Sequence, residues 1–121
     1  MITTIPVALI ATIVSIVDGD TIKVNLPCDQ PIFCKAIPVR VGHLDTPEIH
    51  GQCPEEKDLA LKARAITASY FAVGSKVELV NPRRDQYFRI DADFPELEQK
   101  LISMVLAKPY EGGKKKEWCN E

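Results

Sequence analysis

The stretch 39–48, VRVGHLDTPE, combines residue types that could bind a phosphate and a metal ion. Its valines alternate as on a strand, so Arg40 points to the opposite face, where a partly buried guanidinium requires anionic partners or a ligand. Pro47 ends the strand and holds Asp45 and Glu48 on a stiff turn near Arg40. A cation beside two acids on rigid backbone suggests a phosphate and a metal. The alternative is a purely structural ion pair.

A second acid-bearing turn lies between two expected strands. Residues 8–17 form a nearly continuous apolar run, which predicts a strand buried on both faces, and residues 21–26 alternate between apolar and polar. Asp18 and Gly19 between them predict a hairpin, in which Asp18 serves the turn. The turn itself does not require Asp20, whose carboxylate would project from a fixed backbone.

Two helices are predicted from the spacing of apolar residues. The first begins at Pro54 and stops at Gly74, and the second begins at Pro95 and ends at Pro109. The expected apolar stripes consist of Leu59, Ala63, Ile66 and Tyr70 in the first helix and of Leu97, Leu101, Met104 and Val105 in the second.

Two further short strands are predicted over 76–80 and 86–92, with a turn at residues 81–82. Alternation places Tyr87 and Arg89 side by side on one face of the last strand. The resulting order is strand, strand, strand, helix, strand, strand, helix. It contains the ingredients of a mainly β fold with helices (α+β), a five-stranded Greek-key barrel of the OB type with two helices. Such barrels commonly bind oligonucleotides on one face.

The composition fits a single domain, in which we expect a core over 8–110 and a tail over 111–121. The chain has 121 residues, of which 45% are hydrophobic and 26% charged, and a net charge of -2. This charge is not that of a protein that coats nucleic acid, although a local basic patch suffices for a nuclease. We expect a monomer. We expect no membrane span, because the apolar N-terminal residues are too few to cross a bilayer. These residues also lack the features of a signal peptide.

Four cysteines permit two disulfides, and three pairings are conceivable. Cys28 and Cys34 flank a short loop that they could staple, and Cys53 and Cys119 would then tie the tail to the body. Trp118, beside the last cysteine, is expected to pack as an anchor. Unpaired buried thiols are the alternative. The cysteines favour an extracytoplasmic setting, whereas the N-terminus offers no clear signal peptide.

Three motifs in this order resemble the staphylococcal nuclease (thermonuclease) family. They are VDGDT at 17–21, the stretch 39–48, and DQYFR at 85–89, with a helix expected between the second and third. The tail 106–114, LAKPYEGGK, is similar to the tails of bacterial members. The resemblance runs from about residue 8 to residue 110. The chain departs from the best-known member at Phe88, where that protein has glycine, and lacks its long third helix.

The resemblance implies a calcium-dependent phosphodiesterase that acts on DNA and RNA and has an OB-fold barrel. Its implied site consists of Asp20, Asp45 and the Thr46 carbonyl as Ca²⁺ ligands, Glu48 to orient or deprotonate water, Arg40 and Arg89 to bind the phosphate, and Tyr87 and Tyr110 as substrate contacts. Apart from the resemblance, Arg84 with its neighbour Arg83 and the lysines at 114–116 could form a local basic surface for the substrate, or only a solvated face.

The chemistry agrees with these roles. A phosphodiester requires positive charge against its oxygens and an activated water, which a hard cation and two arginines can supply. His43 and His50 flank the loop without a second ligand at metal spacing, so we expect them to be structural or exposed. The alternative function is a non-catalytic OB module that binds nucleic acid or protein. Such a module is expected to lose acids or arginines, and none of the set is missing here.

Overall fold

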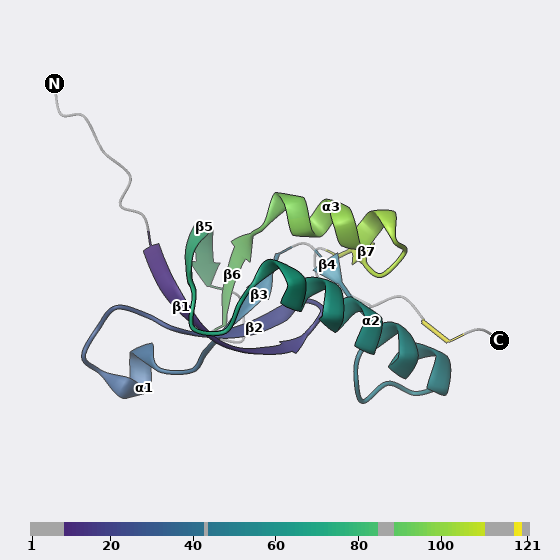
Figure 1. The fold of residues 1–121 in the computed structure, drawn as a ribbon, viewed down its shortest axis with the longest axis horizontal. Coiled ribbons are helices and arrows are strands. Elements are labelled where there is room, and N and C mark those ends of the chain that lie inside the picture. Colours follow the sequence, from purple (N-terminus) through teal and green to yellow (C-terminus); the bar gives the residue numbers. More distant parts are fainter. Residues whose placement is uncertain (1–8, 43, 85–88, 111–117, 120–121) are drawn as a thin grey trace, which may run out of the picture.

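The computed structural model describes residues 9–42, 44–84, 89–110 and 118–119, whose arrangement is drawn in Figure 1. The elements in chain order are β1 (Leu9–Asp18), β2 (Thr21–Asn25), α1 (Pro31–Cys34), β3 (Ile37–Val41), β4 (Leu44–Asp45), α2 (Pro54–Tyr70), β5 (Lys76–Arg84), β6 (Ile90–Asp93), α3 (Pro95–Ser103) and β7 (Lys108–Pro109).

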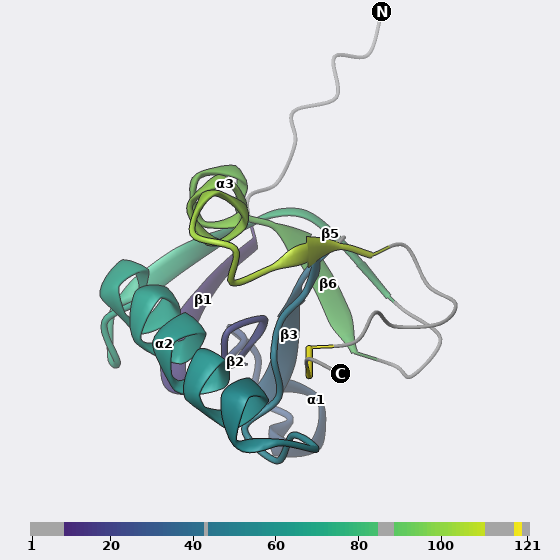
Figure 2. The ribbon, with the colours of Figure 1, turned by 90° about the vertical axis from the view of Figure 1, so that its right-hand side faces the viewer.

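A closed barrel of five strands forms the body of the protein. Its strand order is β1-β2-β3-β6-β5, and β5 pairs with β1 to close it. The neighbours run antiparallel except for the parallel pair β3 and β6. Figure 2 shows α2 along one side of the barrel and α3 across another. The predicted α+β class and OB-type barrel are thus confirmed, with a short third helix, α1, in the connection that was expected to be irregular.

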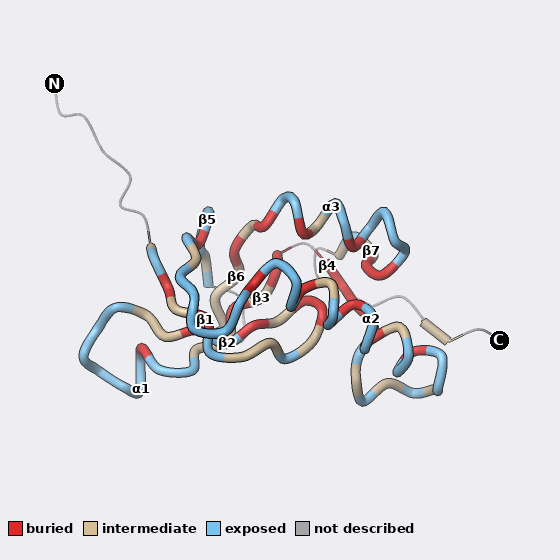
Figure 3. Tube along the Cα trace, in the orientation of Figure 1, coloured by how far each residue is buried: buried red, intermediate tan, exposed pale blue. Residues whose placement is uncertain are grey.

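The barrel interior is filled by side chains that alternate along the strands. Ile22 and Val24 on β2, and Val39 and Val41 on β3, are fully buried, as their alternation predicts. Figure 3 shows buried and more exposed positions alternating along the chain. Strand β1 departs from the prediction, because its outward-facing residues, such as Val14, are exposed. A continuous apolar run does not reveal whether one face or both faces will be covered.

Strand β5 continues through the residues at which a turn was predicted. Asn81 adopts a positive φ of 50°, and the pairing with β6 shifts register between Val80 and Arg83. The chain therefore forms a bulge, where Asn tolerates the left-handed conformation and Pro82 need not donate a ladder hydrogen bond. The prediction of a turn was wrong for this reason.

The second long helix ends earlier than predicted. It stops at Ser103 rather than at Pro109, because Val105 takes a positive φ of 57° and the Leu106 N–H turns back to bond the last helical turn. Leu106 thereby enters the core, and Met104 and Val105 are left 45% and 70% exposed. Their expected place on the apolar stripe was wrong.

Helix α2 contacts the barrel through small residues rather than through the predicted stripe alone. Ala63 is fully buried, whereas Tyr70 is exposed and the helix ends there. Gly74 follows with a φ of 89°, so this glycine serves the turn after the helix. The complete set of buried residues on α2 is Glu56, Ala60, Ala63 and Thr67.

The expected disulfides are both formed. Cys28 pairs with Cys34 across the loop that contains α1, and Cys53 pairs with Cys119 across 66 positions of sequence. Disulfides persist mainly in oxidising compartments, which agrees with an extracytoplasmic setting.

Candidate functional site

The hairpin between β1 and β2 carries the first candidate acid. Asp18 pairs with Thr21, so the turn consists of Gly19 and Asp20, one residue later than predicted. The Asp20 N–H donates to Asp18 Oδ1 at 3.2 Å, and the Thr21 hydroxyl donates to Asp20 Oδ1 at 2.9 Å. The Asp20 residue is only 7% exposed. Its carboxylate is therefore held in place by the turn itself.

Helix α2 fixes where this hairpin lies. A Cβ on Gly19 would stand 2.7 Å from Ala63 Cβ and 3.1 Å from Thr46 Cβ, so only glycine permits this close approach. The buried Thr67 hydroxyl donates to the Gly19 carbonyl at 2.7 Å. The glycine in the VDGDT motif is thus required by packing, since its φ is not positive.

Strands β3 and β4 bring the other predicted residues to the same end of the barrel. Arg40 Nη2 lies 3.8 Å from Asp20 Oδ2 and donates to the Leu44 carbonyl at 2.9 Å. The Thr46 N–H lies 3.4 Å from Asp20 Oδ2. Asp45 and Thr46 are 3% and 2% exposed. Residues from separate strands therefore meet at Asp20, whose carboxylate lies beside Arg40 and the Thr46 N–H, with the buried Asp45 next in the chain; we call these residues the acid cluster.

The Asp18 carboxyl titrates unusually in this cluster. Burial, and after it the negative charge of Asp20, raise its pKa from 3.8 to about 7. Two acids therefore lie close together at the hairpin, and the Arg40 guanidinium lies 3.8 Å from one of them.

We expect Asp18→Asn to flatten the pH dependence of stability. Because the pKa of Asp18 is raised in the folded state, the protonated carboxyl stabilises the folded wild type. This contribution to the free energy of unfolding is complete below pH 3.8 and is lost as the pH rises through about 7. Each pKa unit corresponds to about 1.4 kcal/mol, and we discount this value because Asp18 is only partly buried. Between low and high pH the free energy of unfolding should therefore fall by on the order of 1–2 kcal/mol more in the wild type than in the variant. Urea unfolding at pH 4.5 and pH 8 in EDTA measures this difference. Asp29→Asn, on an exposed loop, is the matched control, and an equal pH dependence in Asp18→Asn and wild type would contradict the prediction.

The loop that carries Glu48 is shaped by a buried acid that the sequence reasoning missed. Glu56 accepts hydrogen bonds from the Glu48 N–H and the Gln52 N–H, both at 3.1 Å. Glu48 itself is exposed. The signal for Glu56 was its place in the first helical turn, where a glutamate can reach back to N–H groups that precede the helix.

A row of alternating charge crosses three strands beside Arg40. Arg40 on β3 is in register with Asp91 on β6, which is in register with Arg83 on β5. Arg83 pairs with Asp93 at 2.8 Å, and its guanidinium contacts the position that a Cβ on Gly42 would occupy. Gly42 thus leaves room for Arg83, a partner that only the barrel register reveals.

The remaining predicted residues are distributed around this row. Arg89 is partly buried and immediately precedes β6. Arg84 is exposed and in register with Ile90, so it alternates with Arg83. His50 is exposed, as expected. The predictions for Tyr87, His43 and the lysines at 114–116 fall outside the described residues.

The C-terminal segment returns to the acid cluster. Lys108 on β7 pairs with Asp45 on β4, and the Tyr110 ring centroid lies 5.3 Å from Arg40 Cζ. The Trp118 indole N–H donates to Asp45 Oδ2 at 3.0 Å, and Lys108 Nζ stands 4.1 Å from the centre of its ring. Trp118 is therefore an anchor, as predicted, but one that packs against a candidate ligand residue.

The donor atoms at this end of the barrel suit a hard cation. The Asp20 and Asp45 carboxylates and the backbone carbonyl of Thr46 are all oxygens, the ligand type that Ca²⁺ prefers. Among the described residues, the one group of three acid, cysteine or histidine ligands that lie together is Cys53, Glu56 and Cys119. Its two sulfurs are joined in a disulfide, so they cannot serve as thiolate ligands.

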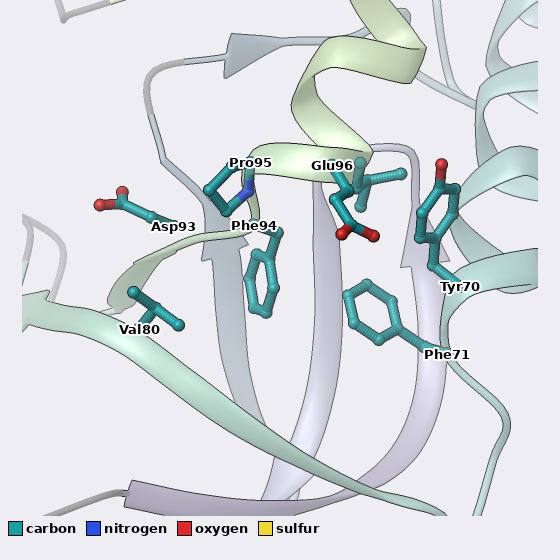
Figure 4. Close-up of a pocket in the computed structure, with 8 residues that line it drawn as sticks. Tyr70, Phe71, Val80, Asp93, Phe94, Pro95 and Glu96 are labelled. Atoms are coloured by element: carbon teal, nitrogen blue, oxygen red, sulfur yellow. The ribbon is translucent and has the colours of Figure 1, made fainter.

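A pocket of about 330 Å³ lies elsewhere, between the C-terminal end of α2, β5 and the start of α3. Figure 4 shows the rings of Phe71 and Phe94 in its lining, with Glu96 between Phe94 and Tyr70 and Asp93 at the left. The two rings pack edge to face at 5.2 Å. Its lining shares no residue with the acid cluster, so it offers no part of the candidate site.

No protein-family model matches this chain, and no curated protein is significantly similar to it. Within the described part of the chain, the longest helix is too short or too polar to cross a bilayer.

Proposed function

We propose that this protein is a Ca²⁺-dependent nuclease that hydrolyses phosphodiester bonds of DNA or RNA. The observation that carries the proposal is the convergence of Asp20, Asp45, Thr46 and Arg40 at one end of an OB-type barrel, with Arg40 3.8 Å from Asp20. The order of the three sequence motifs supports the same activity.

Each residue of the cluster has a task in this reaction. Asp20, Asp45 and the Thr46 carbonyl would hold Ca²⁺, which supplies positive charge against the phosphate oxygens. Arg40 already donates to Leu44, and the rest of its guanidinium fork can bind a phosphate oxygen.

The water that attacks the phosphorus would be handled by Glu48. Its backbone N–H is fixed by Glu56, so the exposed carboxylate is presented from an ordered loop. Arg89, which immediately precedes β6, would stabilise the negative charge that develops on the phosphate oxygens. A carboxylate is a weak base, so orientation of the water contributes more than proton removal.

A second candidate function is an OB module that binds nucleic acid without cutting it. It is favoured by the pairing of Arg40 with Asp20 and of Arg83 with Asp93, which neutralises much of the charge that catalysis would use. This module would bind single-stranded DNA equally well in Ca²⁺ and in EDTA.

The test is cleavage of single-stranded DNA by wild type and Glu48→Gln, in Ca²⁺ and in EDTA. We expect Ca²⁺-dependent cleavage that falls by about 10²–10⁴-fold in the variant, the usual contribution of a positioned acid–base group. Glu55→Gln removes the same charge from an exposed position in the first turn of α2 and should cleave like wild type. Binding without cleavage by the wild type would leave the binding module as the function.

A further inference from the structure

The acid cluster is touched by a segment that is distant in sequence. Trp118 and Cys119 form the short yellow segment near the C-terminus in Figure 2. The indole N–H of Trp118 donates to Asp45 Oδ2 at 3.0 Å, across 73 positions of sequence. Asp45 is almost fully buried, so this contact takes place inside the candidate site.

The indole is held on two sides. Cys119, the next residue, is bonded to Cys53, which caps the N-terminus of α2. The ring also packs against Lys108, whose Nζ lies 4.1 Å from the ring centre and whose backbone pairs with Asp45. The disulfide thus keeps Trp118 close to Asp45, and the cation–π contact with Lys108 holds the ring in place.

Resting on the proposed function, we propose that Trp118, held by the Cys53–Cys119 disulfide, is a positioning residue that orients the Asp45 carboxylate toward Ca²⁺. Indole nitrogen is a donor only, so it cannot compete with a carboxylate as a ligand. The Trp118 N–H donates to Oδ2 and so fixes the plane of the Asp45 carboxylate. Groups that hydrogen-bond to metal ligands commonly orient those ligands in this way.

The test compares Ca²⁺ affinity in wild type and Trp118→Phe by calorimetry. Phenylalanine keeps an aromatic ring for Lys108 and removes the N–H. We expect the dissociation constant for Ca²⁺ to rise by about 10-fold, the usual effect of removing a hydrogen bond to a ligand. Tyr70→Phe, on the exposed end of α2, is the control and should bind Ca²⁺ like wild type. Unfolding in EDTA separates this effect from a loss of fold.

A second measurement is made on the wild type itself, with Asp45→Asn as its control. Trp118 is the single tryptophan of the chain, so one indole N–H resonance reports on this contact. We expect Ca²⁺ to shift this resonance in the wild type and to leave it unchanged in Asp45→Asn.

The outcomes distinguish the two proposals. If the wild type binds Ca²⁺ and Trp118→Phe binds it equally well, the positioning role is overturned and the nuclease proposal stands. If Ca²⁺ binds and the chemical shift of the indole N–H does not change, the positioning role is likewise overturned. If the wild type binds no Ca²⁺, the proposed function and the inference both fall.

Discussion

Arg40→Lys is expected to lower the rate of Ca²⁺-dependent cleavage by about 10²–10³-fold, the usual loss when one group that stabilises transition-state charge is removed. Lysine keeps the charge but loses the guanidinium fork, of which Nη2 reaches the Leu44 carbonyl and Asp20 and the rest would bind a phosphate. The measurement is single-turnover cleavage of single-stranded DNA at saturating Ca²⁺.

The same variant should also be less stable. The Arg40 side chain is about nine-tenths buried, so its loss leaves the Leu44 carbonyl and the Asp20 carboxylate poorly satisfied, at a cost of about 1–3 kcal/mol. Cleavage is therefore measured well below the unfolding temperature of the variant. Arg64→Lys is the matched control, because Arg64 is an exposed arginine of α2 that also donates to a carbonyl. Cleavage by Arg40→Lys within about threefold of wild type would remove Arg40 from the proposed site.

Replacement of Cys53 and Cys119 by serine is expected to lower the free energy of unfolding by about 4 kcal/mol. The bond closes a loop with a sequence separation of 66, and the chain entropy of the unfolded state rises with loop length when the bond is removed. Serine at position 53 can still cap α2, so the loss is due to the disulfide rather than to the cap. Urea unfolding of the pure proteins in EDTA measures the effect.

The second disulfide supplies the comparison. Cys28 and Cys34 are separated by only 6 positions, and their replacement by serine should cost about 2 kcal/mol. The α1 loop that they close lies at the opposite end of β2 and β3 from Asp20, so cleavage should be unchanged. Equal losses of stability for the two pairs would contradict the dependence on loop length.

The sequence by itself determined the barrel class and most of the acid cluster. Alternation along β2 and β3 follows from the two-residue period of a strand, which burial of Ile22 and Val39 confirms. The positions of Asp20 and Asp45 at strand ends are equally local, because turn residues beside them decide where the strands stop. Such information is carried by neighbours in the chain, so it can be read without the fold.

The tertiary structure alone decided which distant groups meet. The contact between Trp118 and Asp45 depends on a disulfide and on β7, and the place of Arg83 above Gly42 depends on barrel register. Burial of Glu56 likewise depends on the loop that folds back onto α2.

Local sequence patterns also gave wrong predictions at two positions with a positive φ, Val105 and Asn81. Val105 belongs to an apolar helical pattern, but a left-handed turn at that residue sends Leu106 to the core in its place. A turn was predicted at Asn81, but the structure has a bulge there, because pairing with β6 on both sides of Asn81 stabilises a continuous strand. In both cases long-range packing outweighs local preference, since propensities amount to only about 1 kcal/mol per residue and burial of one large apolar side chain to about 1.5–3 kcal/mol.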